Sequence, residues 1–397
     1  MLSRIEIANF KSIGQASVNL TRQNVIVGPN GVGKSNLLDA IHFLRDAAND
    51  GLDHAVTKRH GILSIRRWSK TRPFNIILKV HFAHGETHGD YKIAIASAGE
   101  EFSVIEEEGN WFSPPPFGMD TGIAGPVLHS FKRNSEGLIE FNLPKSPFEI
   151  SLLPAVHRSE LLITQFGSSS FSPLSYFFRD LWKEVTSCGA YSIYPNKIRE
   201  PQTISNSDVL ADDGTNLASI IRQMRETKYR TNREALTSEI KQVLPIVGEI
   251  HVKSAGGFYV PVFRVRETSG GQAHDLNMAQ ISDGTLRMLG MLAAFYQPKA
   301  PVRITLEEPE QMIHPGLLPV LVDALEDYVE EGSVPRQVLI TTHSPNLLDL
   351  FPPDSIIGAR FEDGVSSFSA ISERQLKIVR ERLFSAGELL VAEGIFN

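Results

Sequence analysis

Hydrophobic and polar residues alternate along the first twenty positions of the chain, at residues 5–10 and again at 16–20. Such alternation is typical of strands with one buried face. Residues 24–27 then form a short, largely apolar run that stops at a glycine, as a strand buried on both faces does. Apolar side chains at helical spacing follow over residues 37–44. The pattern therefore predicts two strands, a buried strand, a loop and a helix, in that order.

The middle of the chain changes its hydrophobic period. Residues 73–141 contain short β-rich runs separated by Gly, His and Ser, which predict an antiparallel meander, with the proline-rich stretch 113–118 as a loop or exposed tip. From about residue 150 to 245 apolar residues recur at helical spacing. Residues 249–265 alternate again around two glycines and predict a hairpin.

The last third of the chain alternates between helical and strand patterns. We expect helices at 284–296, 316–331 and 345–351, and strands at 302–306, 337–341 and 355–359. Strands that alternate with helices form a parallel sheet whose faces the helices cover. The predicted fold class is therefore α/β, with a parallel-sheet core, an antiparallel β-lobe and a helical lobe.

Composition is that of an ordinary globular protein and excludes several classes. The 397 residues include 39 Lys and Arg against 46 Asp and Glu, a net charge of -7, which argues against a wholly basic nucleic-acid coat protein but not against a local basic groove. The single cysteine, Cys188, excludes a disulfide framework and fits a reducing compartment. The sequence has no run of eighteen apolar residues and opens on a strand pattern rather than a signal peptide. We therefore expect a cytoplasmic protein with no membrane partner.

The segment GPNGVGKS at residues 28–35 matches the phosphate-loop pattern G-x-x-x-x-G-K-[ST]. It lies between a predicted buried strand and a predicted helix, where glycines let backbone N–H groups converge on phosphates and the helix adds a positive dipole end. Lys34 is expected to contact the β- and γ-phosphates of ATP, and Ser35 to bind Mg²⁺. The expected nucleotide-binding residues here are Gly28, Pro29, Asn30, Gly31, Val32, Gly33, Lys34, Ser35 and Asn36.

Two acidic residues, Glu307 and Glu308, stand at the end of a predicted strand. Glu307 would support the Mg²⁺ shell, and Glu308 would orient or deprotonate the attacking water. The alternative is an acidic helix N-terminus, where glutamate is favoured in any case. His343 follows the next predicted strand and could hydrogen-bond the γ-phosphate or the water, or else serve as a capping or core histidine. His314 is expected to make a structural or interface contact.

Five segments occur in an order that resembles the ABC-type ATPases of the SMC/RecF branch. They are residues 5–12 (IEIANFKS), the phosphate loop, and residues 281–285 (ISDGT), 307–310 (EEPE) and 342–345 (THSP). More narrowly, the chain resembles compact bacterial AAA-family ATPases related to RecF and to the ATPase half of OLD nucleases, over essentially its whole length. The shorter segments that match this subgroup are Tyr194-Pro195, Ile198-Arg199-Glu200, residues 213–217 and residues 387–389.

In that family the ISDGT stretch is the signature motif, which implies that Ser282, Asp283 and Gly284 reach the γ-phosphate bound by a partner protomer. The residues also fit an anion by themselves, because the Ser282 hydroxyl, the N–H of Gly284 and the helix dipole form a second anion site. The alternative is an ordinary helix N-cap, which a serine here also fits. The resemblance thus implies ATP and Mg²⁺ as ligands, and a homodimer or higher even oligomer.

Glu307 departs from the aspartate that is usual at the first carboxylate in this family, so Mg²⁺ could be held directly or through water. No glutamine-loop residue is evident. Lys11 and Ser12 match a hairpin that often approaches nucleotide in the family, but a plain surface hairpin fits them equally. The resemblance and the pattern together predict an ABC-type P-loop head in three parts: residues 1–150 with the phosphate loop and β-lobe, 151–270 as a helical lobe, and 271–397 with the signature, the acidic strand end and the histidine.

The resemblance implies an ATP-driven switch that acts in DNA repair or phage defence with a separate protein effector such as a nuclease. No nuclease constellation is evident in the sequence. DNA is a candidate partner through residues 66–72 (RRWSKTR), which a solvated turn explains as well. The main alternative is a slowly or non-hydrolysing ATP-gated scaffold that holds or inhibits a partner. The cytoplasmic ATPase of a transporter fits less well, because residues 9–12 and the ISDGT stretch resemble the SMC/RecF branch.

Overall fold

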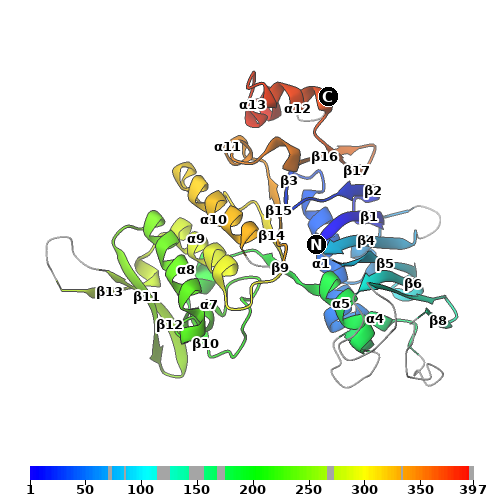
Figure 1. The fold of residues 1–397 in the computed structure, drawn as a ribbon, viewed down its shortest axis with the longest axis horizontal. Coiled ribbons are helices and arrows are strands. Elements are labelled where there is room, and N and C mark those ends of the chain that lie inside the picture. Colours follow the sequence, from blue (N-terminus) through cyan, green and yellow to red (C-terminus); the bar gives the residue numbers. More distant parts are fainter. Residues whose placement is uncertain are drawn as a thin grey trace. The chain divides into compact units, whose positions relative to one another are not determined.

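The computed structural model consists of two compact units, coloured along the chain in Figure 1. Unit 1 combines Met1–Cys188 with Ile357–Ile371, and unit 2 combines Gly189–Ile356 with Ser372–Ile395. The structure describes residues 1–69, 74–84, 86–113, 126–142, 156–167, 175–265, 272–331 and 334–392. The three-part division predicted from the sequence, with boundaries at residues 150 and 270, rests on the hydrophobic pattern, whereas the two units rest on contacts between residues. The three-part division stays a prediction.

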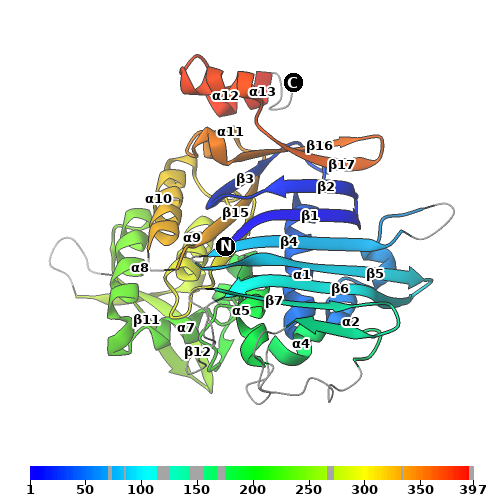
Figure 2. The same ribbon diagram turned by 45° about the vertical axis from the view of Figure 1, so that its right-hand side comes forward.

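Unit 1 is built on a sheet that contains the predicted N-terminal strands. β1 (Leu2–Phe10) and β2 (Ile13–Asn19) pair antiparallel, with Ile5 opposite Val18 and both side chains buried. The predicted meander is present as β4 (Ile76–His84), β5 (Thr87–Ala98), β6 (Glu101–Ser113), β7 (Val127–Arg133) and β8 (Ile139–Asn142). Beyond β2 the order continues with β17 (Val365–Ala370), β16 (Ile356–Glu362) and β3 (Gln23–Val27). Figure 2 shows β1, β4, β5 and β6 side by side.

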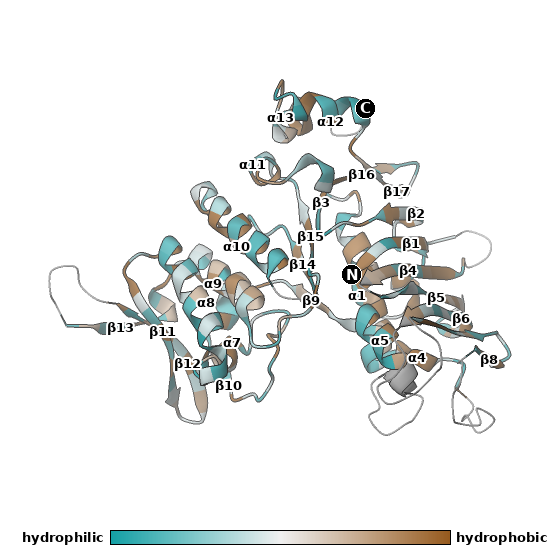
Figure 3. Ribbon diagram, in the orientation of Figure 1, coloured by the Kyte–Doolittle hydropathy of each residue, from teal (hydrophilic) through white to brown (hydrophobic). Residues whose placement is uncertain are grey.

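Helix α1 (Lys34–Asp50) follows β3 and carries the predicted apolar stripe. Leu37, Leu38, Ile41 and Leu44 are all buried. Figure 3 shows hydrophobic residues along α1 and along the neighbouring strands β1 and β4. The other helices of the unit are α2 (Leu52–Thr57), α3 (Ile62–Ile65), α4 (Leu162–Gly167) and α5 (Ser175–Thr186), and α2, α4 and α5 contact α1.

A buried ionic cluster ties α4 to the sheet of unit 1. Glu107 on β6 is fully buried, and its carboxylate accepts hydrogen bonds from the backbone N–H groups of Leu162 (2.7 Å) and Ile163 (3.1 Å). The Tyr91 hydroxyl donates a third hydrogen bond at 3.0 Å, and the buried Arg133 guanidinium lies 3.7 Å away. Burial raises the pKa of Glu107, and the hydrogen bonds and the Arg133 charge oppose that rise. The Glu107 carboxylate therefore accepts hydrogen bonds from three buried donors and offsets the charge of Arg133.

Glu107→Ala is expected to lower the free energy of unfolding by about 3–5 kcal/mol, because it leaves the Arg133 charge buried without its carboxylate. Glu108→Ala is a matched control on the same strand, since Glu108 is only half-buried, and its expected loss is about 0–1 kcal/mol. Denaturant unfolding followed by tryptophan fluorescence measures both values. Similar losses in the two variants would rule out a special structural role for the cluster.

Unit 2 contains the parallel strands predicted for the last third of the chain. β14 (Arg303–Glu307) and β15 (Gln337–Thr342) pair parallel, with Glu307 opposite Thr341, and β9 (Cys188–Tyr191) adjoins β14. The predicted helices are present as α9 (Asp283–Tyr296) and α10 (Leu318–Glu330), which pack against each other. Because β14 and β15 run in the same direction, the residues that follow them lie at one edge of the sheet.

A lobe of helices and strands precedes α9 in unit 2. The elements are α6 (Pro195–Arg199), β10 (Gln202–Thr203), α7 (Leu217–Gln223), η2 (Thr227–Tyr229), α8 (Arg230–Val243), β11 (Val247–Ala255), β12 (Phe258–Val265), β13 (His274–Asn277) and η3 (Met278–Gln280). The predicted hairpin is present as β11 and β12, with Val252 opposite Pro261. β11 pairs along the whole of β12, so β10 and β13 pair with the other edge of β12.

The end of the chain differs from the predicted pattern in two places. The helix predicted at 345–351 is shorter, α11 (Pro345–Leu348), and a 3-10 turn, η5 (Pro353–Ser355), follows because prolines interrupt a helix. The strand predicted at 355–359 continues to Glu362 and turns back antiparallel, so the sheet is mixed rather than purely parallel. The last described elements are α12 (Glu373–Arg380) and α13 (Ala386–Ala392). Within the described ranges, no helix has both the length and the apolar character needed to span a membrane.

Candidate functional site

The phosphate loop, residues 28–35, connects β3 to α1 in unit 1. Gly31 and Gly33 have φ angles of 82° and 99°, which favour glycine. The Lys34 side chain is only 5% exposed, and its Nζ donates hydrogen bonds to the carbonyl oxygens of Gly28 at 2.8 Å and Pro29 at 2.9 Å. Helix α1 begins at Lys34, so the positive end of its dipole adds to the ammonium charge at this loop. This concentration of positive charge fits an anionic ligand.

The hairpin of β16 and β17 supports the phosphate loop from a distant part of the chain. The Ser366 hydroxyl on β17 lies 2.5 Å from the Ser12 hydroxyl, which accepts a hydrogen bond from Asn36 Nδ2 at 2.6 Å. A Cβ atom at Gly33 would lie 2.2 Å from Ser366 Oγ and 2.7 Å from Ser12 Oγ. A side chain at position 33 would therefore displace these two hydroxyl groups, in addition to straining the backbone. Sequence reasoning missed Ser366, because a serine shortly after a turn carries no signal of its own.

The turn between β1 and β2 lies against α1. Lys11 Nζ pairs with Asp39 Oδ2 on α1 at 2.7 Å, and Arg59 pairs with the other oxygen of the same carboxylate. Burial works to raise the pKa of Asp39, but Arg59 and Lys11 outweigh it and lower the pKa overall. Lys11 and Ser12 therefore contact the helix that begins at the phosphate loop, and whether they approach nucleotide stays a prediction.

In unit 2 the predicted catalytic residues Glu308 and His343 lie in contact. Glu308 Oε1 is 3.2 Å from His343 Nδ1, and Gln311 Nε2 donates a hydrogen bond to Glu308 Oε2. Glu308 has a φ angle of 42°, which is uncommon for a residue other than glycine, and its N–H donates to the Thr341 carbonyl oxygen at 2.9 Å. Backbone outliers of this kind cluster at functional sites. The half-buried Glu308 carboxylate and the exposed His343 ring are thus in contact at the end of the parallel strands.

A second carboxylate, Glu310, lies beside this pair and was not predicted. Its Oε1 accepts a hydrogen bond from the Thr342 hydroxyl at 2.5 Å. Arg287 of α9 donates to the Glu308 carbonyl oxygen at 3.1 Å, and its charge interacts with that of Glu310. Burial lowers the pKa of Arg287, and the neighbouring carboxylates oppose this. Among the described residues, Glu310 Oε2 and Arg287 Nε are buried without a hydrogen-bond partner, so this network has unused polar atoms.

The predicted signature residues form the exposed start of α9. The Ser282 hydroxyl accepts a hydrogen bond from the Thr285 N–H at 3.3 Å, so the N-cap interpretation is confirmed. Arg199 of α6 pairs with Asp283 and donates to the Ile281 carbonyl oxygen at 2.9 Å. A Cβ atom at Gly284 would lie 2.5 Å from the Met312 carbonyl oxygen. The start of α9 is therefore held by α6 and by the segment that follows Glu308 and Glu310.

Three other residues singled out in the sequence are His314, Ser35 and Glu307. His314 caps the 3-10 turn η4 (Pro315–Leu317), where its Nδ1 accepts from the Gly316 N–H at 3.1 Å, in line with a structural role. Ser35 belongs to unit 1 and Glu307 to unit 2, and their role toward Mg²⁺ stays a prediction. Across the described part of the chain, no group of three or more His, Cys, Asp or Glu side chains is placed to hold a metal ion.

The basic segment 66–72 is only partly described. Arg66 donates a hydrogen bond to the Ser97 hydroxyl at 2.7 Å, and the Arg67 guanidinium lies 5.8 Å from the centre of the Phe74 ring. Trp68 is 73% exposed. Residues 70–72 and most of the predicted tip at 113–118 lie outside the described residues. The DNA-contact interpretation of this segment stays a prediction.

A model of the family described as "AAA domain, putative AbiEii toxin, Type IV TA system" matches residues 131–349, more than half of the chain. The chain belongs to this AAA-domain family. A model described as "RecF/RecN/SMC N terminal domain" also matches residues 1–57, which contain the phosphate loop. The predicted resemblance to SMC/RecF/OLD-like ABC-type ATPases is thereby confirmed.

The curated relatives of this AAA-domain chain include two kinds of protein. DNA replication and repair protein RecF of Porphyromonas gingivalis is 49% identical over 45 residues, which are 11% of this chain and 12% of RecF. Endonuclease GajA of Bacillus cereus is 24% identical over 365 residues, which cover 87% of this chain and 56% of GajA. The chain thus matches a short segment of RecF and little more than half the length of GajA.

Solved structures confirm the ABC-type head fold for this member of the AAA-domain family. The SMC head bound to the C-terminal winged-helix domain of ScpA is 16% identical, with a TM-score of 0.51, 95% of this chain covered and 99% of that one. The Smc head of Pyrococcus furiosus with an extended coiled coil is 12% identical, with a TM-score of 0.52 and coverages of 96% and 99%. At these identities the likeness establishes the fold alone.

Proposed function

We propose that the chain is an ATP-binding and ATP-hydrolysing switch. The observation that carries the proposal is the Lys34 ammonium group, buried in a glycine loop at the start of α1 and hydrogen-bonded to two carbonyl oxygens of that loop. The β- and γ-phosphates of ATP suit this position, because their oxygens can replace the carbonyl oxygens as partners of the ammonium group. The AAA-domain and RecF/RecN/SMC matches support nucleotide binding in general.

Ser35 and Glu307 are the proposed protein ligands of Mg²⁺. A hydroxyl and a carboxylate supply the oxygen donors that Mg²⁺ prefers. When bound, Mg²⁺ neutralises part of the negative charge on the triphosphate. Glu307 reaches one methylene farther than an aspartate, so its carboxylate can act directly or through a water molecule.

Glu308 is the proposed general base. Its carboxylate contacts His343 and accepts from Gln311, two groups that hold it in one orientation. A carboxylate fixed in this way can accept a proton from an attacking water, and His343 can hydrogen-bond the water or the γ-phosphate. The Glu310–Thr342 hydrogen bond lies next to His343 in the sequence and would keep that strand end in place.

The start of α9 is the proposed contact with a second protomer. Ser282 and Asp283 are exposed, and Arg199 and Met312 hold the turn that carries them. The Ser282 hydroxyl and the backbone N–H groups at the start of α9 suit the γ-phosphate bound by a partner chain. We infer a homodimer or higher even oligomer that closes on ATP and loosens after hydrolysis.

DNA repair or phage defence is the proposed setting, in the cytoplasm and with a separate effector such as a nuclease. The names of the relatives support it, since RecF is a replication and repair protein and GajA an endonuclease. The chain spans 12% of RecF and 56% of GajA, and a second polypeptide is the proposed source of any cleavage. DNA itself is a candidate ligand.

A slowly or non-hydrolysing ATP-gated scaffold is the second candidate. Glu307 favours the scaffold. Its side chain is longer than the usual aspartate at the first carboxylate, so it would position the metal ion less firmly. Steady-state phosphate release by the full chain, with and without DNA, separates the two. Saturable, Mg²⁺-dependent turnover on the order of 1 s⁻¹ or faster, typical of enzymes, supports the switch. ATP binding without measurable turnover under any of these conditions would favour the scaffold.

Gly33→Ala is expected to weaken ATP binding at least about ten-fold more than Gly31→Ala. Both glycines have positive φ angles, but only at Gly33 does an added methyl group meet other atoms, those of Ser12 and Ser366. Titration with a fluorescent ATP analogue measures the two affinities. The double variant Gly33→Ala, Ser366→Ala removes the nearest atom and should recover part of the loss. Equal affinities in the two single variants would show that Ser366 does not shape the loop.

A further inference from the structure

A depression on the lobe of unit 2 lies outside the residues assigned above. It has a volume of about 630 Å³ and is lined by residues of α7 and β12 and of the segment that follows β10. That volume lies within the range of sites for small molecules, roughly 300–1,000 Å³. Its lining includes Ser205, Ser219, Arg222, Gln223, Arg225 and Tyr259.

Two arginines in this depression have no carboxylate partner within the part of the chain that the structure describes. No ion pair of Arg222 or Arg225 is found among the described residues, and the one carboxylate in the lining, Glu226, is paired with Lys228 at 3.0 Å. The Arg222 guanidinium lies 4.7 Å from the centre of the Tyr259 ring, which is buried beneath it. In a chain of net charge -7, two uncompensated guanidinium groups in one depression mark a site for an anion.

The floor of the depression offers further hydrogen-bonding groups. Ser219 is 1% exposed, and its hydroxyl accepts from the Ser205 N–H at 3.1 Å, which leaves the hydroxyl proton to be donated. Gln223 Oε1 is buried and has no hydrogen-bond partner among the described residues, although its Nε2 donates to the Ser207 carbonyl oxygen at 2.8 Å. Within the described ranges, the buried acceptor Gln223 Oε1 is therefore unused, and the buried Ser219 hydroxyl lies in the same lining.

Apolar side chains lie in the sequence next to the lining residues. Phe258 precedes Tyr259 and is 42% exposed, and Ile204 precedes Ser205 and is 52% exposed. The two are neighbours, because Thr203 pairs with Phe258 between β10 and β12. Adjacent residues of a strand face opposite sides of the sheet, so the Phe258 ring lies on the face away from Tyr259 and is not part of the depression.

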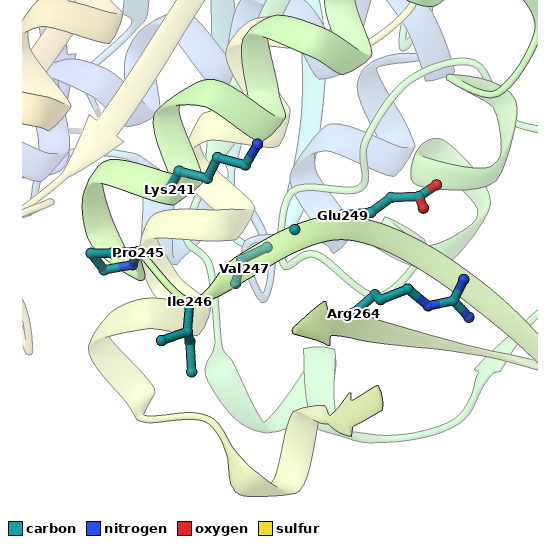
Figure 4. Close-up of a pocket in the computed structure, with 7 residues that line it drawn as sticks. Lys241, Pro245, Ile246, Val247, Glu249 and Arg264 are labelled. Carbon is teal, nitrogen blue, oxygen red and sulfur yellow. The ribbon is translucent and has the colours of Figure 1, made fainter. Parts of the chain in front are cut away.

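The depression at the start of β11, shown in Figure 4, is the contrasting case. Lys241, Glu249 and Arg264 line it in a volume of about 620 Å³. Arg264 is paired with Asp275 at 3.1 Å, and Glu249 adds a negative charge to the lining. The two depressions are similar in size, but the one at the start of β11 has no excess positive charge. We therefore do not expect it to bind an anion.

We propose that the depression at Arg222 and Arg225 binds a phosphate of a nucleotide unit. The guanidinium groups and the Ser219 hydroxyl would contact the phosphate oxygens, since planar guanidinium groups bind phosphate in a bidentate manner. Gln223 Oε1 would accept a hydrogen bond from a ring N–H group of the attached base, such as N3–H of thymine. A single-stranded nucleic acid and a free nucleotide share this chemistry, and the test distinguishes them.

The test measures binding of fluorescein-labelled (dT)12 and of 5′-dTMP to the full chain, in a Lys34→Ala background that silences the phosphate loop. Arg222→Gln with Arg225→Gln should weaken binding about ten-fold or more near 0.1 M salt and flatten the dependence of log K on log salt by roughly 0.7 for each lost phosphate contact. Arg22→Gln with Arg374→Gln is the matched control, because it removes the same charge from two other exposed arginines. The affinity of the Arg222→Lys variant should lie between those of the parent and the double variant. Lysine keeps the positive charge but loses the planar stacking on Tyr259.

Binding of (dT)12 alone, lost in the double variant, identifies a nucleic-acid strand as the ligand. Binding of 5′-dTMP with the same sensitivity identifies a free nucleotide. The proposal is overturned if neither probe binds, or if the control pair weakens binding as much as the Arg222 and Arg225 pair. Thermal melts of all variants should agree with that of the parent, because the substituted side chains are exposed.

Discussion

Glu308→Gln should retain ATP and hydrolyse it about 10²–10⁴-fold more slowly than the wild-type chain. The amide keeps the size of the carboxylate and can still contact Gln311 and His343, so the strand end should keep its structure. An amide cannot accept a proton from water, and the step that needs a base is lost. Because closure precedes hydrolysis in the proposed cycle, this variant should accumulate in the closed, ATP-bound state.

Phosphate release and bound nucleotide measured on the same samples test this expectation. Glu330→Gln is a suitable control, since Glu330 is an exposed residue of α10 and the substitution makes the same change in charge. A Glu308→Gln variant that hydrolyses ATP at the wild-type rate would remove Glu308 from the mechanism. A variant that neither binds nor hydrolyses ATP would assign Glu308 to binding instead.

Lys34→Ala should abolish ATP binding. The ammonium group is buried in the loop with two carbonyl partners, and hydrogen bonds to a charged group contribute about 1.5–3 kcal/mol each. Loss of two comparable bonds to phosphate weakens affinity by about 100-fold or more. The chain should still fold, because the alanine leaves no charge buried.

Isothermal titration with ATP and Mg²⁺ measures the loss, and Lys377→Ala on the surface of α12 is the control. Unchanged affinity in Lys34→Ala would contradict the assignment of the phosphate loop. A lowered melting temperature without loss of affinity would assign Lys34 a purely structural role.

The parts of the site that depend on neighbouring residues could be predicted from the sequence. Strand, glycine loop and helix are consecutive around Lys34, and the motif itself fixes their order. Glu308 and His343 are 35 positions apart, yet each follows a strand, and parallel strands bring such residues to one edge. Their place at one edge of the sheet therefore follows from the secondary-structure pattern, whereas their contact depends on the pairing of β14 with β15.

The residues that support the site could not be predicted, because their contacts depend on tertiary packing. Ser366 meets Ser12 only through the pairing of β17 with β2, and a serine in a strand gives no sign of this. Arg199 was noted as a family match, but its pairing with Asp283 depends on how α6 packs against α9. The buried Glu107 is a similar case, since its charge is acceptable only beside the donors that the fold brings to it.

The central claim is that ATP closes two protomers through the start of α9, and the mass of Glu308→Gln in solution tests it most directly. Addition of ATP and Mg²⁺ should double the mass from the 44.0 kDa of one chain. Ser282→Arg in the same background should bind ATP and stay at the mass of one chain. Ser372→Arg, which removes the equivalent N-cap of α12, should still double. A Ser282→Arg variant that doubles as readily, or a Glu308→Gln chain that binds ATP without any change in mass, would contradict the claim.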